Sequence, residues 1–203
     1  MLFRSGGINF RPPGPLAVNV SVRRQWSIDD RQYLLGQTVL NQNYYVLGRI
    51  NRHEASITFR GDIAMSSRLS LQLYAQPFAS GRAFDRIRLV SNARGGSYQS
   101  QFDLLGPDRL TRSADDSVRI DLDRDGTTDL SFLEPNRRVV SLRTNAVLRW
   151  EFRPGSTLYL VWQQRREDVA PVGDLDLSRD WSALVHHAPD NVLALKATWW
   201  VGV

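Results

Sequence analysis

The segment LRTNAVLRWEFRPGSTLYLVWQQRR, residues 142–166, decides the fold class of this chain. On both sides of Pro154-Gly155 its side chains alternate between an apolar and a largely polar set. The apolar set is Leu142, Thr144, Ala146, Leu148, Trp150, Phe152, Leu158, Leu160 and Trp162. The set between them on the first strand is Arg143, Asn145, Val147, Arg149, Glu151 and Arg153. Successive strand residues point to opposite faces, so the pattern predicts a hairpin of the kind that separates lipid from water.

The same period of two recurs along most of the chain. It is clear in residues 18–23, 55–63, 69–76 and 193–201. Helical periodicity is confined to a short helix expected at 177–187, with Asp174 or Asp176 as its N-terminal cap. These patterns predict an all-β fold.

Composition is compatible with a transmembrane barrel and argues against some other classes. The chain has 203 residues, 42% of them hydrophobic, a net charge of +5 and no cysteine. No segment approaches the roughly 18 apolar residues of a membrane helix, but barrel strands need apolar residues only at alternate positions. The arginines are spread one or two to a strand, whereas nucleic-acid binding needs them clustered on one surface. We therefore expect no nucleic-acid partner, and without cysteine no disulfide scaffold.

Turn lengths predict the direction of each strand, because outer-membrane barrels have short periplasmic turns and long outer loops. The short connections Met65–Ser67 and Pro154–Gly155, and a turn at Pro12–Pro15, are assigned to the periplasmic side. Region 79–138 then becomes a long extracellular insertion with hairpins of its own at 98–105, 117–123 and 127–133. Segment 31–50 is either a membrane hairpin or an outer extension. The six expected membrane strands are 16–26, 54–64, 68–78, 139–152, 156–166 and 190–203.

Aromatic residues fall at the expected strand ends. At the outer ends lie Trp26, Phe78 and Trp162; at the inner ends lie Trp150, Phe152, Trp199 and Trp200. Two aromatic belts are typical of the two interfaces of a bilayer. A soluble β-sandwich or a lipocalin-like barrel remains the alternative, although its core would not need aromatic residues at strand ends.

The sharpest local motif is DLDRDGTTD, which begins at Asp121. Its carboxylates at positions 1, 3, 5 and 9, with glycine at position 6, have the spacing of calcium loops. Phe132 stands where an EF-hand has glutamate, so the motif is closer to the calcium loops of β-rich extracellular proteins. A hairpin turn closed by Asp-Gly is the competing interpretation. The candidate calcium ligands are Asp121, Asp123, Asp125 and Asp129; no cofactor is otherwise required.

Other reactive residues support no defined catalytic site, and G-x-S-x-G and a cysteine nucleophile are absent. His186 and His187 are expected on a loop or helix surface, because adjacent residues point apart and no third ligand has zinc spacing. The pairs Asp115-Asp116 and Glu167-Asp168 could serve a glycosidase but more simply mark polar loops. Arginines on the polar faces could attract anions to a pore or form ion pairs with Asp62 or Glu151. The arginines concerned are Arg60, Arg143 and Arg149.

Four blocks of the chain also resemble a bacterial family of unknown function. They are YYVLGRINRHEASITFR (44–60), LSLQLYAQPFASG (69–81), NAVLRWEFRPGSTLYLVWQQ (145–164) and DNVLALKATWW (190–200). Full-length members of that family carry a family-9-type carbohydrate-binding module before an outer-membrane-like barrel. Some are labelled membrane-associated hydrolases. The resemblance implies an outer-membrane location and a link to glycans through a module that this sequence lacks.

Together these observations predict the C-terminal portion of an antiparallel transmembrane β-barrel with about six to eight membrane strands. The expected role is anchoring or transport in the bacterial outer membrane. The alternatives are a soluble β-sandwich that binds glycans and a membrane-associated hydrolase. Unpaired strand edges are costly in hydrocarbon, so we expect upstream strands or a partner chain to close the barrel. The sequence MLFRSGGINFRPPGP, residues 1–15, lacks signal-peptide features, so we expect the true N-terminus to lie upstream.

Overall fold

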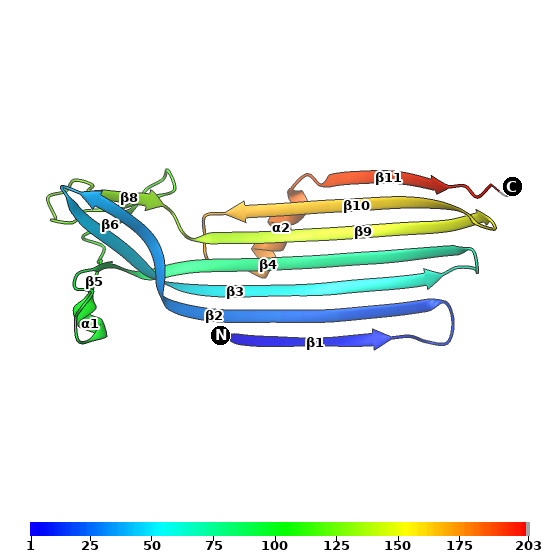
Figure 1. Ribbon diagram of the computed structural model, residues 1–203, viewed down its shortest axis with the longest axis horizontal. Coiled ribbons are helices and arrows are strands. Elements are labelled where there is room, and N and C mark those ends of the chain that lie inside the picture. The colour runs from blue at the N-terminus through cyan, green and yellow to red at the C-terminus, as the bar shows by residue number, and fades with distance from the viewer. Residues whose placement is uncertain (202–203) are drawn as a thin grey trace.

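The computed structural model describes residues 1–201 and confirms the all-β prediction, with 66% of the chain in strands and 6% in helices. Seven long strands form one antiparallel sheet that curls into a half-barrel (Figure 1). Their order across the sheet is β1 (Leu2–Phe10), β2 (Leu16–Val39), β3 (Gln42–Ala64), β4 (Leu69–Val90), β9 (Arg137–Arg153), β10 (Ser156–Ala170) and β11 (Asp190–Thr198). In the part of the chain that the structure describes, no helix has the length and apolar character needed to cross a membrane.

The remaining elements are short and lie mostly in the connection between β4 and β9. Strand β5 (Phe102–Leu104) pairs with β4, and a second sheet contains three strands. These are β6 (Leu110–Arg112), β7 (Ser117–Ile120) and β8 (Leu130–Leu133). The helices are α1 (Tyr98–Gln101) and α2 (Leu177–His186).

The short connections gather at one end of the main sheet. Figure 1 shows the β1–β2, β3–β4 and β9–β10 turns at the same end as the last residues of β11. This arrangement confirms the predicted relative strand directions. The β9–β10 turn is tight because Arg153 pairs with Ser156, which leaves only Pro154 and Gly155 between them. Gly155 has a φ of 76°, a left-handed conformation that favours glycine.

The main sheet has one apolar and one polar face, and the register shows this row by row. One row crosses six strands and consists of Leu16, Ile63, Leu71, Leu148, Leu160 and Leu195. A second row on the same face crosses all seven and consists of Phe10, Val18, Gly61, Leu73, Ala146, Trp162 and Leu193. The row between them points the other way and is mixed, consisting of Ala17, Asp62, Gln72, Val147, Val161 and Ala194. The next row on that opposite side, beyond the second apolar row, is mainly polar and consists of Asn9, Asn19, Arg60, Tyr74, Asn145, Gln163 and Val192. We call these two sides the apolar face and the polar face.

The largest buried cluster lies near the short elements and not along the apolar face. It contains Val46, Ile87, Leu89, Leu105, Ile120 and Leu130. Extended parts of β3 and β4 supply half of it, and β7, β8 and the residue after β5 supply the rest. Leu34, Leu35 and Val39 of β2 pack against the cluster. Segment 31–50, for which the sequence left two alternatives, is the continuation of β2 and β3 as one long hairpin. Its turn is Leu40-Asn41, with φ values of 48° and 64° that suit a two-residue hairpin turn.

Helix α2 lies on the apolar face near β9 and β10. Leu184 is 1% exposed and packs with Ala79 of β4 and Val140 of β9. The predicted cap is confirmed as Asp176, whose side chain accepts hydrogen bonds from the backbone N–H groups of Ser178 and Arg179. The cap sets where the helix begins, and Leu184 fixes which side faces the sheet.

Several predicted boundaries differ from the observed ones. Strand β1 was not predicted, since Gly6-Gly7 interrupts its alternation, and β4 continues to Val90 instead of ending near residue 78. The predicted hairpin at 98–105 is wrong: Ser97 and Ser100 form a capping box that starts α1, and β5 then pairs with β4. The hairpins predicted at 117–123 and 127–133 correspond to β7 and β8, which pair with one another. The final strand ends at Thr198, and residues 202–203 lie outside the described part.

Candidate functional site

The apolar face is the most extensive surface feature of the main sheet. Large side chains on it are exposed, including Ile8 at 73%, Leu193 at 71% and Leu195 at 69%. Exposed apolar patches larger than a few hundred Å² indicate contact with a membrane, a partner or a ligand. Within residues 1–201, α2 packs against one part of this face, and the rows between β1 and β11 remain accessible.

Aromatic residues cluster at the turn end of the apolar face. The ring of Phe152 lies 6.0 Å from that of Trp150 and 5.1 Å from that of Trp199, centroid to centroid. The Arg153 guanidinium stands 5.8 Å from the Trp199 ring centroid. Gly155 closes the adjacent turn, where an added Cβ would come within 3.0 Å of the Trp200 side chain. The predicted inner aromatic group is therefore a contiguous cluster.

Two further tryptophans of the apolar face combine an exposed ring with a satisfied N–H. The Trp26 Nε1 donates to Asn51 Oδ1 at 2.7 Å, and its ring stacks on His53. The Trp162 Nε1 donates to Asn191 Oδ1 at 3.1 Å. Such half-polar, half-apolar contacts are typical of an interfacial tryptophan. Trp162 departs from the predicted outer end of its strand, because it shares a row with Phe10 and lies two rows from Trp150, whereas β10 continues to Ala170. Phe78 departs from the prediction, because it pairs with Ser56 and Ser141 and shares the polar face.

On the polar face, only one of the three singled-out arginines is in the expected ion pair. The Arg149 Nη2 lies 3.6 Å from Glu151 Oε2. The Arg60 guanidinium instead stands 5.7 Å from the Tyr74 ring centroid. Arg143 lies directly across from Arg165 on the neighbouring strand. The face thus carries hydrogen-bonding groups and partly uncompensated positive charge, which suits contact with water and anions.

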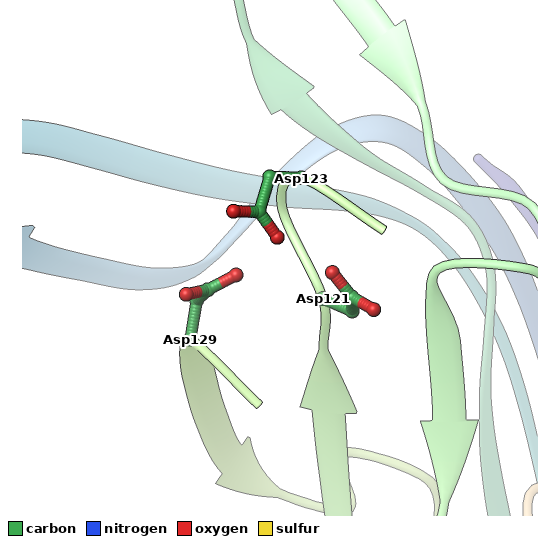
Figure 2. Close-up of side chains that lie close together, drawn as sticks. All are labelled: Asp121, Asp123 and Asp129. Carbon is green, nitrogen blue, oxygen red and sulfur yellow. The ribbon is translucent and has the colours of Figure 1, made fainter. Parts of the chain in front are cut away.

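The DLDRDGTTD segment forms the β7–β8 connection and brings together three of its four aspartates. One carboxylate oxygen from each of Asp121, Asp123 and Asp129 lies within 4.8 Å of the other two. Figure 2 shows the Asp123 and Asp129 carboxylates facing one another, with Asp121 beside them. Carboxylates at this separation can share a hard cation such as Ca²⁺. Calcium at this loop stays a prediction.

Backbone hydrogen bonds also account for much of this loop. Asp121 accepts from the N–H groups of Arg124 and Gly126, and Asp129 accepts from that of Leu122 at 2.6 Å. The fourth candidate, Asp125, is outside the three-carboxylate group and accepts from the Thr127 hydroxyl and N–H. Those two bonds hold the pKa of Asp125 below its usual range. The arrangement is therefore also that of a hydrogen-bonded turn.

The histidines and paired carboxylates do not meet in one cluster, although His187 contacts Asp168. His186 Nδ1 lies 2.7 Å from the Ser182 carbonyl oxygen, whereas His187 Nε2 lies 3.1 Å from Asp168 Oδ1. Asp115 binds Ser117 and Arg119, and Glu167 binds Arg165. Each of the residues just named thus has a local structural partner.

One charged network was not anticipated from the sequence. Arg138, on the apolar face of β9, donates to Asp180 of α2 and, at 2.5 Å, to Asp168 of β10. Asp180 is 1% exposed and also accepts from Arg179 Nε at 2.9 Å. One feature of the sequence could have revealed it. Asp180 and Leu184 are four residues apart, so they lie on the same side of the helix, and a carboxylate beside a buried leucine needs a partner.

Comparison with protein-family models gave no match, and neither did comparison with curated proteins or with solved structures.

Proposed function

We propose that this chain is part of an outer-membrane β-barrel, with the apolar face against lipid and the polar face toward a water-filled interior. The observation that carries the proposal is the alternation across all seven strands. An apolar row runs from β1 to β11, and the row beside it on its loop side, which points to the opposite face, is polar on six of the seven strands. The wall of a transmembrane barrel requires an apolar face toward lipid and a polar face toward water.

The dimensions and aromatic positions support the same proposal. A tilted membrane strand needs about 9–11 residues, and the main strands are 9 to 24 residues long. Tryptophans occur toward both ends of the strands, with Trp150 and Trp199 near the turns and Trp26 on the loop side. The resemblance of blocks 44–60, 69–81, 145–164 and 190–200 to an outer-membrane-like family points in the same direction.

The polar face favours a role in anchoring or in passage of polar solutes. Arg60, Arg143 and Arg149 would face the interior, where exposed positive charge favours anions. We place the turns in the periplasm, the β5–β8 region outside the cell, and any link to glycans in an additional module. The competing role is a soluble glycan-binding sandwich, in which a second protein layer would cover the apolar face.

Site-directed spin labelling tests the orientation, because the chain has no native cysteine. Single cysteines would be introduced at Leu71, Gln72, Leu73 and Tyr74, and the purified protein would be reconstituted in phospholipid vesicles. We expect labels at Leu71 and Leu73 to collide with oxygen, and those at Gln72 and Tyr74 with a water-soluble nickel complex. A monomer that folds in buffer without detergent, with the nickel complex reaching both faces, would contradict the proposal.

A further inference from the structure

A groove hollows the apolar face between α2 and strands β2 to β4. Its apolar wall consists of Val22, Ala55, Ile57, Pro77, Ala79 and Val140, and Trp181 of α2 forms the opposite side. The cavity is about 350 Å³ and open to the surface. Leu184 anchors α2 against Ala79 and Val140, which leaves Trp181 at 42% exposure beside the groove. The helix therefore forms one wall of a channel on a face otherwise made of strands.

Two arginines lie together at the loop-side end of this groove. Arg24 lines it, and Arg4 is directly opposite Arg24 on the neighbouring strand, on the same face. Within residues 1–201 neither arginine forms an ion pair. The adjacent positions on this face are Gly6, Val22, Ala55 and Trp26, none of which is acidic. The acidic residue that lines the groove, Asp180, is 1% exposed and is paired with Arg138 and Arg179.

Like charges directly opposite one another destabilise a strand pair, so an anion between these two guanidinium groups would relieve repulsion. Arginine also binds phosphate oxygens through charge-assisted hydrogen bonds in a fixed fork geometry. The apolar groove begins at the same place, and Trp26 lies in the next position along the strand on that face. One ligand that satisfies both features has an apolar chain joined to an anionic phosphate.

We propose that this groove binds a single anionic phospholipid. One acyl chain lies between Trp181 and the wall formed by Val22, Ala55 and Ile57, and the head-group phosphate contacts Arg4 and Arg24. The proposal rests on the proposed function, because a bilayer supplies the ligand. It adds a specific lipid site to a surface that would otherwise contact lipid non-specifically.

The test uses the full chain in dodecyl maltoside micelles, with phosphatidylglycerol or zwitterionic phosphatidylcholine as the added probe. Native mass spectrometry counts the lipids retained. Brominated acyl chains quench nearby tryptophan, and the Trp181→Phe variant isolates the contribution of Trp181. We expect one phosphatidylglycerol to be retained in preference to phosphatidylcholine, with quenching that is lost in Trp181→Phe.

Three variants separate the parts of the site. Arg4→Gln with Arg24→Gln should weaken phosphatidylglycerol retention about tenfold, since each removes a charge-assisted hydrogen-bond donor. Ala55→Leu keeps both arginines but fills the groove, so it should reduce quenching of Trp181. The matched control, Arg143→Gln with Arg165→Gln, removes another directly opposed arginine pair from the polar face and should leave retention unchanged.

Equal loss in both arginine pairs, or equal retention of the two lipids, would overturn the proposal. Displacement of phosphatidylglycerol by an equal concentration of inorganic phosphate would also overturn it, because the acyl chain would then contribute nothing. Failure of the barrel proposal has a different signature, namely a chain that folds as a monomer without detergent. The lipid-retention assay therefore gives an interpretable result whether or not the barrel proposal holds.

Discussion

Asp180 joins helix α2 to the main sheet. Its carboxylate is 1% exposed and accepts from Arg138, from Arg179 Nε and from the Asp176 backbone N–H. Arg138 is itself buried, and Asp168 is its second carboxylate partner. A buried cation depends on such partners, because removing one leaves a charge without compensation in a poorly solvated place.

We therefore expect Asp180→Asn to lower the free energy of unfolding by about 3 kcal/mol, the loss typical of breaking a buried ion pair. The control is Asp174→Asn, because Asp174 pairs with Arg179 at the surface and its side chain is 66% exposed. An exposed ion pair contributes about 0–1 kcal/mol, so this control should change stability little. Denaturant unfolding, followed by tryptophan fluorescence, compares the two. Equal effects would show that the buried network does not stabilise the attachment of α2.

The side-chain period in the sequence predicted the main strands but not the contacts made where strands end. Leu142 to Phe152 and Leu158 to Trp162 alternate, which fixes which residues share a face. Alternation does not say how far β2, β3 and β4 extend, since bulges at Asp29/Gln32, Tyr33/Leu35 and Leu47/Arg49 shift the register there. The Arg138–Asp180 network joins residues 42 positions apart, so no local pattern contains it.

The acidic loop shows the same limit at a smaller scale. Spacing alone put Asp121, Asp123, Asp125 and Asp129 in one set, and the structure brings three of them together. Asp125 is drawn away because Thr127, two residues later, offers its carboxylate both a hydroxyl and an N–H. A competing Asx turn of this kind depends on backbone conformation, which a ligand-spacing motif does not specify.

At the scale of the element, acid should destabilise helix α2 by protonating its N-terminal cap. Hydrogen bonds from the backbone N–H groups of Arg179 and Ser178 hold the pKa of Asp176 below its ordinary value of 3.8. A lowered pKa in the folded state means that the cap stabilises the helix above pH 3.8. That stabilisation is lost as the pH falls from there through the lower folded-state pKa.

We expect acid titration of the wild-type protein to release α2 and shift Trp181 fluorescence below about pH 4, the ordinary range of an aspartate. Asp176→Ala lacks the acceptor, so its helix should already be less stable at neutral pH and lose less on acidification. Asp176→Asn retains a side-chain acceptor and serves as the control, with a smaller loss at neutral pH. The same acid dependence in Asp176→Ala as in wild type would assign the effect to other groups.

At the scale of the whole molecule, the two edges of the sheet run in the same direction. The seven strands are all antiparallel to their neighbours, so β1 and β11, the first and seventh, are parallel to one another. Unpaired backbone groups at both edges would cost several kcal/mol each in hydrocarbon. Antiparallel closure of a barrel therefore needs an odd number of additional strands, and a single one would reach the bacterial minimum of about eight.

This parity predicts that β1 and β11 do not touch in the assembled barrel. Flanking one added strand, they would lie about 9.6 Å apart, beyond the roughly 7 Å limit between Cα atoms for a disulfide. Asn9→Cys would be combined in turn with Val192→Cys, Ala194→Cys or Lys196→Cys, all on the polar face, and oxidised in vesicles. We expect no intramolecular disulfide in any pair, whereas the control Asn9→Cys with Asn19→Cys joins directly paired residues and should oxidise. Efficient bonding between β1 and β11 would instead mean that the chain closes on itself through one parallel pair.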